Sequence, residues 1–283
     1  MKNTFRLKKI NWVTSFSGLL LFLSVAVKSQ TDSNTLFVSE LVHFYEQRCG
    51  QQLQGGLFTQ FATDTPYVNL YISKKEHVEN GLQSGYFISC KNDLKKAKRQ
   101  DSLYRDKFET FIYWSQANVN TKLTSELLSY RRETQAFIVF HELTHVFLSQ
   151  LQSKLTFTVG ESLCDLVGNY MTREFAVATK KLNLKTTDAQ ILLNEQLYTL
   201  MNSTIVKIDN DPKQKLNIHS ICEKELKRHL PKMDGLQKKR YNHPVNNAYL
   251  YRNSFYSENY FDLKTRLLEN RQLPKDLRKI AKG

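Results

Sequence analysis

Apolar residues recur at helical spacing through most of the chain. The segment from Ser33 to about Cys49 has this spacing, and two short runs, YVNLYI (67–72) and GYFISC (85–90), are rich in the aromatic and β-branched residues that favour strands. After residue 91 few glycines or prolines interrupt the pattern, which predicts helices at 94–116, 124–153, 161–182, 188–208, 213–230 and 244–270. The turn NDP at 210–212 separates two of them. The expected fold class is α+β and predominantly helical.

The first 29 residues follow a different pattern. Lys and Arg at positions 2, 6, 8 and 9 precede an apolar stretch from Trp12 to Val27, an order typical of a secretory signal peptide. The residues around Ser29 suit a signal peptidase, so we expect cleavage after it. Uncleaved anchoring is the weaker alternative, because a membrane-spanning helix needs about 20 apolar residues and serines and threonines interrupt this stretch. The sequence therefore predicts an exported protein, periplasmic or secreted, without a stable membrane span.

The remaining residues, 30–283, contain no internal repeat and no low-complexity linker. We therefore expect one domain, with a mixed α/β amino-terminal part and a helical carboxy-terminal part.

The sequence HELTH occupies 141–145, inside the predicted helix at 124–153. Residues four apart share one face of a helix, so His141 and His145 can bind one ion while Glu142 points to the water beside it. The neighbouring positions are nearly all apolar, which is typical of a buried helix. Two histidines and a glutamate would be costly to desolvate there unless a divalent metal pairs with them. The pattern thus favours a metal site over a structural pair.

A catalytic zinc ion takes three protein ligands and keeps one position open for water. The metzincin extension HExxHxxGxxH is excluded, since Leu148 and Leu151 stand where its glycine and histidine would be. Downstream, GESLCDLVGNYMTREF begins another helix in which Glu161 and Asp165 share a face. We predict Glu161 as the third ligand, with Glu174 as the competing acid, and one Zn²⁺ per chain. Asp165 is expected to accept a hydrogen bond from the non-ligating nitrogen of a ligand histidine.

HELTH followed by GESLCD resembles the gluzincin pattern of HExxH and a downstream ExxxD. More specifically, the chain resembles the family of predicted bacterial zinc aminopeptidases, whose members pair this core with a carboxy-terminal asparagine motif, here PVNNAYLYRNSFY at 244–256. The resemblance implies a zincin-like metallopeptidase domain with the zinc site on two adjacent helices, and aminopeptidase activity. The residues themselves leave exopeptidase and endopeptidase action open, because no GxMEN-like acidic strand precedes HELTH.

The expected reaction is hydrolysis of a peptide substrate, with Glu142 as the general base on zinc-bound water. A donor must stabilise the tetrahedral oxyanion. Candidates for this role or for substrate contact lie in the segment that the motif brings near the site: His219, Tyr241, His243, Tyr249, Asn246 and Asn247. An asparagine pair before a helix is as readily a helix cap.

Two alternatives remain from other classes of protein. One is a metal-binding pseudo-peptidase, which loss of Glu142 would signal, and Glu142 is present. The other is a basic binding module: the chain carries a net charge of +14, which falls to +9 without the leader, since the leader holds five Lys or Arg and no acid. The basic residues are dispersed and are explained by solvated helix faces, so no nucleic-acid partner is expected.

Cys49, Cys90, Cys164 and Cys222 form no CxxC pair, so a cysteine zinc site is unsupported. An oxidising compartment would permit two disulfides in three pairings. Cys164 is expected to be a buried thiol. Gly168, on the same predicted helix, could let two helices approach closely.

Overall fold

The computed structural model describes residues 33–61, 67–75, 85–91, 93–115, 122–268 and 273–282. Spatial clustering separates residues 1–37 from residues 38–283, and the second unit contains the sheet and helices α2 to α11. The predicted helix from Ser33 to about Cys49 is confirmed at 33–49. The predicted signal peptide, 1–29, lies outside the described residues and stays a prediction. Among the described residues, none of the helices combines the length and apolarity that a membrane crossing requires.

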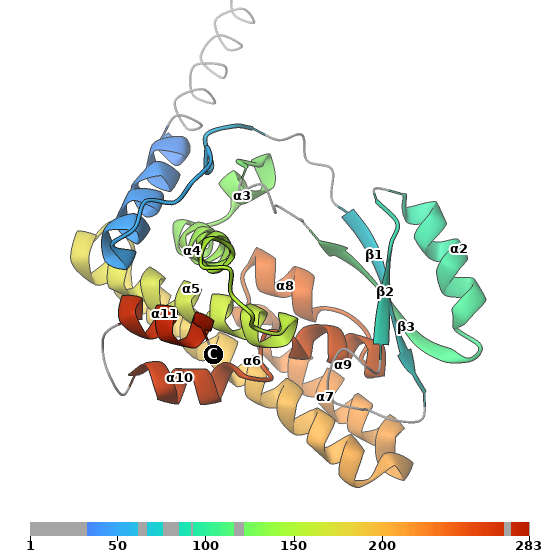
Figure 1. Cartoon of the computed structure of the whole chain (residues 1–283). Coiled ribbons are helices and arrows are strands. Elements are labelled where there is room, and N and C mark those ends of the chain that lie inside the picture. Colours follow the sequence, from blue (N-terminus) through green and yellow to red (C-terminus); the bar gives the residue numbers. More distant parts are fainter. Residues whose placement is uncertain are drawn as a thin grey trace, which may run out of the picture. The chain divides into compact units, whose positions relative to one another are not determined.

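Helices dominate the second unit, and one small sheet accompanies them, so the expected α+β, predominantly helical class is confirmed (Figure 1). The strands are β1 (Tyr67–Lys74), β2 (Gly85–Ser89) and β3 (Phe108–Ser115). The helices are α2 (Leu94–Tyr104), α3 (Ser125–Ser129), α4 (Arg132–Gln150), α5 (Phe157–Thr179), α6 (Leu184–Asn210), α7 (Lys215–His229), α8 (Gly235–Tyr241), α9 (Asn247–Ser254), α10 (Tyr260–Leu268) and α11 (Leu273–Lys282), with short 3-10 turns at Pro212–Gln214 and Leu230–Lys232.

The sheet is antiparallel, with the strand order β2-β1-β3. One of its faces packs on α2 and the other on α9 (Figure 1). Val68 and Ile112 belong to a small apolar cluster with Ala97 of α2, whereas Tyr71 and Phe111 join the main core around α9. Alternate residues of each strand thus serve opposite faces, and β3 lies at one edge of the sheet.

Strand β3 corrects the prediction of one helix over 94–116. The helix ends at Tyr104, and FETFIYWS then runs as a strand paired with β1 in the register Tyr71↔Phe111. The physical reason is that Phe111 and Tyr113 pack on the main core while Ile112, between them, packs on the layer formed with α2, an alternation that a helix could not satisfy. Asp101 helps to fix the turn, because it accepts hydrogen bonds from Thr110 Oγ1 (2.5 Å) and from Arg105.

Other predicted helices are divided or extended. The helix expected at 124–153 breaks at Tyr130 and Arg131, which are extended, with ψ of 160° and 152°. The break is stable because Gln135 Nε2 donates to the carbonyls of Leu128 (3.1 Å) and Tyr130 (2.7 Å). The helix expected at 244–270 divides into α9 and α10 around a turn at 255–259. Helices α8 and α11 were not predicted.

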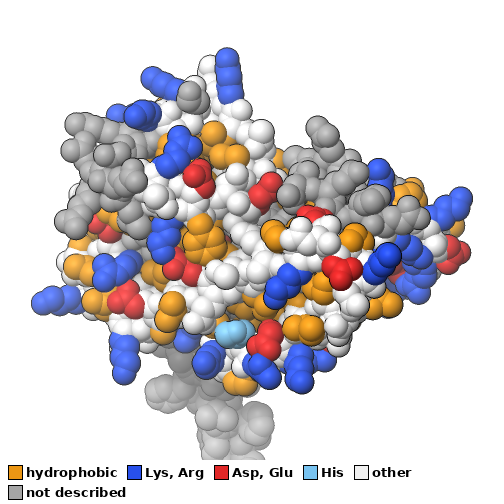
Figure 2. All heavy atoms as spheres, turned by 90° about the horizontal axis from the view of Figure 1, so that it is seen from below, with side chains coloured by type: hydrophobic (Ala, Val, Ile, Leu, Met, Phe, Trp, Pro, Cys, Tyr) orange, Lys and Arg blue, Asp and Glu red, His pale blue; other side chains and the backbone are white. Residues whose placement is uncertain are grey.

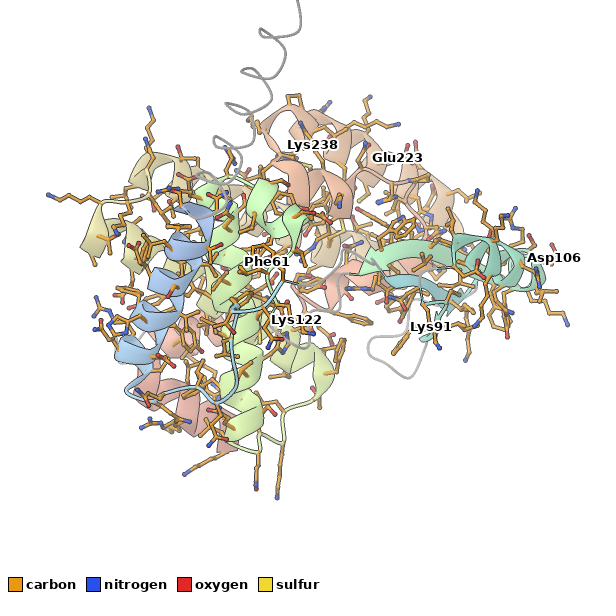
Figure 3. The ribbon with its side chains drawn as sticks, turned by 90° about the horizontal axis from the view of Figure 1, so that it is seen from above. Phe61, Lys91, Asp106, Lys122, Glu223 and Lys238 are labelled. Carbon is orange, nitrogen blue, oxygen red and sulfur yellow. The ribbon has the colours of Figure 1, made fainter. Side chains whose placement is uncertain are left out.

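Two segments far apart in the sequence meet just before α3. The backbone N–H of Leu123 donates to the carbonyl of Gln60 at 2.9 Å, and a parallel bridge pairs Phe61 with Leu123. Figure 3 shows Phe61 and Lys122 at this point. The contact anchors the chain as it enters α3 and α4.

Helices α4 and α5 approach closely at Gly168, as predicted. A Cβ at this position would lie 3.1 Å from the carbonyl oxygen of Phe137 and 3.2 Å from its ring. That separation is tighter than ordinary van der Waals contact, so glycine permits the two helices to pack at this distance.

Buried polar side chains connect four helices. Thr134 of α4 donates to Asp234 at 2.8 Å, and Asp234 caps α8 in a reciprocal capping box with Gln237. Gln237 in turn donates to Asn194 of α6 at 2.6 Å, and Asn194 donates to Asn169 of α5 at 3.2 Å. We call Thr134, Asp234, Gln237, Asn194 and Asn169 the polar chain.

Charged side chains are mixed over the face shown in Figure 2, where Lys and Arg alternate with Asp and Glu. Surface ion pairs such as Arg173 with Asp188 (2.8 Å) and Lys181 with Glu40 (2.5 Å) match this distribution. On this face the basic residues are dispersed, as the sequence indicated.

The four cysteines, Cys49, Cys90, Cys164 and Cys222, are free and buried, so neither of the two permitted disulfides is formed. The expectation of a buried thiol at Cys164 is confirmed. Its burial raises the pKa of the thiol well above the ordinary value, which makes it a poor nucleophile.

Candidate metal centre

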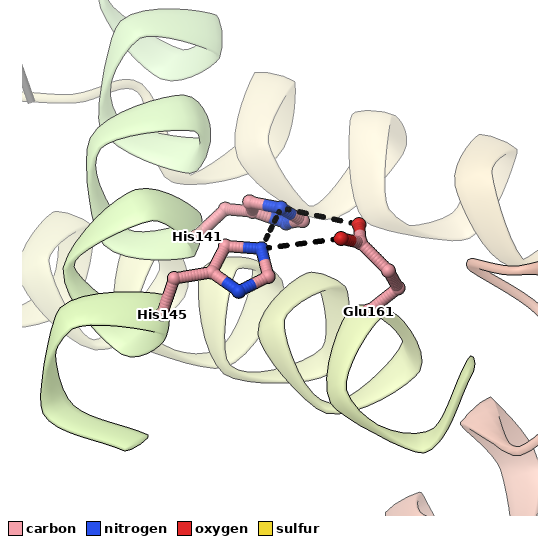
Figure 4. Close-up of side chains that lie close together, drawn as sticks. All are labelled: His141, His145 and Glu161. Atoms are coloured by element: carbon pink, nitrogen blue, oxygen red, sulfur yellow. Dashed lines mark hydrogen bonds and ion pairs between the residues drawn. The ribbon is translucent and has the colours of Figure 1, made fainter. Parts of the chain in front are cut away.

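The two histidines of HELTH and the predicted third ligand meet at one point between α4 and α5 (Figure 4). The Nε2 atoms of His141 and His145 are 3.1 Å apart. His141 Nε2 lies 3.8 Å from Glu161 Oε2, and His145 Nε2 lies 3.5 Å from Glu161 Oε1. The i, i+4 spacing on α4 and the first turns of α5 thus bring the three predicted ligands together.

These distances fit a small divalent ion. Ligand atoms about 2.0–2.1 Å from a tetrahedral centre lie roughly 3.3–3.4 Å from one another. The three measured separations, 3.1, 3.5 and 3.8 Å, bracket that value. Two imidazole nitrogens and one carboxylate are also a donor set that first-row divalent metals take.

The carboxylate of Asp165 lies behind His141. Its Oδ1 lies 2.7 Å from His141 Nδ1, which is within hydrogen-bonding distance. Its Oδ2 accepts from the hydroxyl of Tyr198 and lies 3.3 Å from Arg240 Nη1. Burial alone would raise the pKa of Asp165, but Arg240, His141 and Tyr198 together hold that pKa below its usual value. An ionised Asp165 favours the His141 tautomer with its proton on Nδ1, in which Nε2 is able to bind a metal ion.

The electrostatics of the centre reflect desolvation. Burial raises the pKa of Glu142 to about 7 and also raises the pKa of Glu161. Burial and the neighbouring His141 lower the pKa of His145 to about 3. Burial would lower the pKa of His141 too, but its contact with Asp165 outweighs this and raises it to about 9. A buried group of acids and imidazoles of this kind is one that a divalent cation would stabilise.

The competing acid, Glu174, lies elsewhere. It accepts from the hydroxyl of Tyr170 at 3.1 Å and forms an ion pair with Arg48 at 3.4 Å. Of the two acids considered as the third ligand, Glu161 is therefore the one that joins the histidines.

A cavity of about 770 Å³ opens beside the centre. His141 and Glu142 line it from α4. The other walls come from strand β3, from helices α3, α8 and α9, and from the segments that follow each of these three helices. The volume is in the range of pockets that bind small molecules, roughly 300–1,000 Å³. The side chain proposed to act on water thus faces an accessible space.

Four residues of this site were not singled out in the sequence. Arg240 stabilises Asp165, and its guanidinium lies 3.8 Å from the centroid of the Tyr256 ring. Arg252 Nη2 donates to the Tyr256 hydroxyl at 2.8 Å, and its guanidinium lies 4.6 Å from the Tyr113 ring. Arg252 and Tyr256 fall within PVNNAYLYRNSFY, four residues apart, which was the available signal. No signal in the sequence marked Tyr113 and Arg240, because tertiary contacts alone bring them to the site.

The asparagine pair has structural partners. Asn246 caps α9 by accepting from the backbone N–H of Tyr249 (2.8 Å) and donates to the carbonyl of Thr110 at 3.0 Å. Asn247 is buried, and its Oδ1 lies 3.0 Å from His219 Nε2. Neither asparagine lines the cavity. The pair holds α9 against β3, whose aromatic residues form one cavity wall.

The other candidates divide between cavity and core. His243 lines the cavity and packs edge-on against Phe111, with ring centroids 5.1 Å apart. Tyr241 and Tyr249 are buried in the core, where the hydroxyl of Tyr249 donates to the carbonyl of Tyr241 at 3.5 Å. His219 is buried with Asn247. Of the six candidates, His243 alone lines the cavity.

Comparison of the chain with protein-family models, with curated proteins and with solved structures finds no match in any of the three.

Proposed function

We propose that this protein is a zinc-dependent peptidase of zincin-like architecture. The observation that carries the proposal is the meeting of His141, His145 and Glu161 beside a cavity that His141 and Glu142 line. Two histidines and one glutamate are a ligand set of catalytic zinc sites. The buried Asp165 behind His141 adds the outer hydrogen-bonding partner that such sites use.

Each residue has a distinct role in the proposed reaction. His141, His145 and Glu161 would hold the zinc ion, which when bound lowers the pKa of water and polarises the peptide carbonyl. Glu142 takes the proton of the attacking water and passes it to the leaving amine. An elevated pKa suits a group that accepts and then releases a proton.

Tyr256 is the best-placed donor for the tetrahedral oxyanion. Its ring centroid lies 6.3 Å from that of His141, and it lines the cavity. Its hydroxyl oxygen accepts from Arg252, so the hydroxyl proton is available for donation. Burial raises the pKa of Tyr256, which keeps that proton in place at neutral pH.

Two narrower proposals rest on the sequence. Action as an aminopeptidase follows from the resemblance of HELTH, GESLCD and PVNNAYLYRNSFY to the predicted bacterial zinc aminopeptidases. Export follows from the basic and apolar pattern of residues 1–29.

The deciding experiment compares the wild-type chain with Glu142→Gln and with Glu174→Gln, which removes an acid distant from the centre. Metal content is measured by elemental analysis, and cleavage of a mixed peptide library is mapped by mass spectrometry. We expect about one zinc per chain in all three proteins and cleavage by the wild type and Glu174→Gln only. Zinc retention without cleavage by the wild type would identify a metal-binding pseudo-peptidase. Absence of zinc after zinc-replete refolding would refute the metal site itself.

A further inference from the structure

Arg252 lies in an aromatic setting at the wall of the cavity. Its guanidinium carbon is 4.6 Å from the ring centroid of Tyr113, 5.0 Å from that of Tyr256 and 5.6 Å from that of Phe255. It comes from α9 and lines the same cavity as His141 and Glu142. The rings shield the flat faces of the guanidinium and hold its orientation.

The polar partners of Arg252 are few. A guanidinium has five N–H donors, and Arg252 Nη2 donates to the hydroxyl of Tyr256 at 2.8 Å. Among the described residues, no carboxylate lies within ion-pair distance of it. The neighbouring cations differ: Arg240 pairs with Asp165, and Lys239 pairs with Glu126.

Glu161 attracts Arg252 from beyond ion-pair distance, but Glu161 is itself a proposed metal ligand. A largely desolvated cation with no carboxylate paired to it is costly for a protein to maintain. Its planar fork of donors matches a carboxylate, which it can bind through two parallel hydrogen bonds. Arg252 is therefore better suited to an anionic group that enters the cavity than to the protein around it.

The position of Arg252 indicates how far the bound anionic group would lie from the proposed reaction centre. Its partner, the Tyr256 ring, lies 6.3 Å from the His141 ring, centroid to centroid. Successive residues of a peptide are about 3.8 Å apart. A peptide whose scissile carbonyl lies at the centre could thus place a carboxylate near Arg252 within one or two residues.

We propose that Arg252, held by Tyr113 and Tyr256, binds a carboxylate of the peptide substrate within one or two residues of the scissile bond. This inference rests on the proposed peptidase function and narrows its substrates. The carboxylate is either the carboxy terminus or an acidic side chain. A terminal carboxylate at this distance restricts the enzyme to short peptides or to the last residues of longer ones. An aminopeptidase meets this condition only with di- and tripeptides.

Binding to a catalytically disabled chain tests the inference apart from the reaction. The full-length protein carries Glu142→Gln and Trp12→Phe, which leaves Trp114 on the cavity wall as the sole tryptophan. Zinc-loaded protein is titrated by calorimetry with the peptide Ala-Ala-Ala as the free acid and as the amide, and with Ala-Glu-Ala amide and Ala-Gln-Ala amide, all with a free amino terminus. Trp114 fluorescence reports whether the peptide enters the cavity.

We expect one member of a matched pair to bind at least tenfold more tightly: the free acid over the amide if the site takes a carboxy terminus, or the Glu peptide over the Gln peptide if it takes a side chain. Arg252→Gln should abolish this preference and Arg252→Lys should keep part of it, since lysine retains the charge but not the fork. Arg266→Gln, at an exposed ion pair with Asp262, should leave it unchanged.

Several results would overturn the inference. Equal binding within both pairs, no binding of any peptide, or an undiminished preference in Arg252→Gln would each do so. Lys238 is an exposed cation at the same cavity. If Lys238→Gln lost the preference and Arg252→Gln kept it, the carboxylate would bind Lys238 and the inference would be wrong. If the wild type cleaves no peptide and yet the Arg252-dependent preference appears, the carboxylate site stands and only the peptidase proposal fails.

Kinetics of an active chain separate this role from that of an oxyanion donor. A carboxylate-binding Arg252 predicts that Arg252→Gln raises KM for the preferred peptide and spares its neutral counterpart. An equal fall of kcat for both peptides would instead place Arg252 at the reacting carbonyl and contradict the inference.

Discussion

Replacing Asp165 by asparagine tests the outer support of the metal centre. The change keeps the size of the side chain but removes the charge that faces His141 Nδ1 at 2.7 Å and Arg240 at 3.3 Å. An amide can also turn its NH₂ group toward Nδ1, which favours the wrong histidine tautomer. We expect zinc affinity to fall on the order of 10- to 100-fold, or roughly 1.4–2.7 kcal/mol.

Folding stability should fall as well, because Arg240 keeps its charge in a mostly buried position, with 19% of its side chain exposed. Removing one partner of a buried pair costs about 3–5 kcal/mol. Asparagine still accepts from Tyr198, so we expect a loss in the lower part of that range or below it.

Zinc affinity is measured by competition with a chromophoric chelator, and stability by chemical unfolding of the metal-free protein. Glu174→Gln is the matched control, since it removes one carboxylate from the same helix at a surface ion pair. Glu161→Gln is the positive control, because it weakens a ligand directly. If Asp165→Asn bound zinc within twofold of the wild type while Glu161→Gln lost it, the proposed support of His141 would be refuted.

Three further predictions concern other features. Glu142→Gln should keep near-normal zinc content and lose most peptide hydrolysis, since the amide cannot take a proton from water; full activity would exclude the proposed mechanism. Gly168→Ala should destabilise the protein by about 1–3 kcal/mol in chemical unfolding, because the added Cβ would meet Phe137. The control, Gly160→Ala in the same helix, has open space around the added Cβ and should be neutral or slightly stabilising. Equal effects of the two substitutions would contradict the packing argument. Mass spectrometry of protein exported by its host should find a mature chain that begins at or near Gln30, and an intact Met1 start would oppose signal cleavage.

The meeting of His141, His145 and Glu161 could be predicted because their spacing is local. His141 and His145 share a helix face, and Glu161 lies near the start of the next helix, so the sequence held both the residue types and their order. The position of Asp165 near these residues followed from the same helical period, since it lies four residues after Glu161. Arg240 and Tyr113 could not be placed at the site from spacing, since their positions depend on how α8 and β3 pack against the rest of the protein.

The errors in the fold have similar causes. The helical pattern of α2 led to the extension of that helix through β3, although only pairing with β1 makes a strand of FETFIYWS. Helix α8 is short, and the periodicity of seven residues is a weak signal. Its capping box, Asp234 with Gln237, was visible in the sequence as DGLQ and would have marked its start.

The polar chain also affects how readily α8 unwinds while the rest of the protein stays folded. An isolated helix of this length is unstable in water, and its ends would ordinarily fray faster than the protein unfolds. Unwinding α8 would, however, remove partners from Thr134 and from Asn194, both of which stay buried in helices that remain folded. That penalty raises the free energy of local opening toward that of global unfolding. Backbone amides of α8 should therefore exchange with deuterium almost as slowly as those of α4 and α5. Helix α8, which carries Arg240, would then belong to the slowest-exchanging part of the protein.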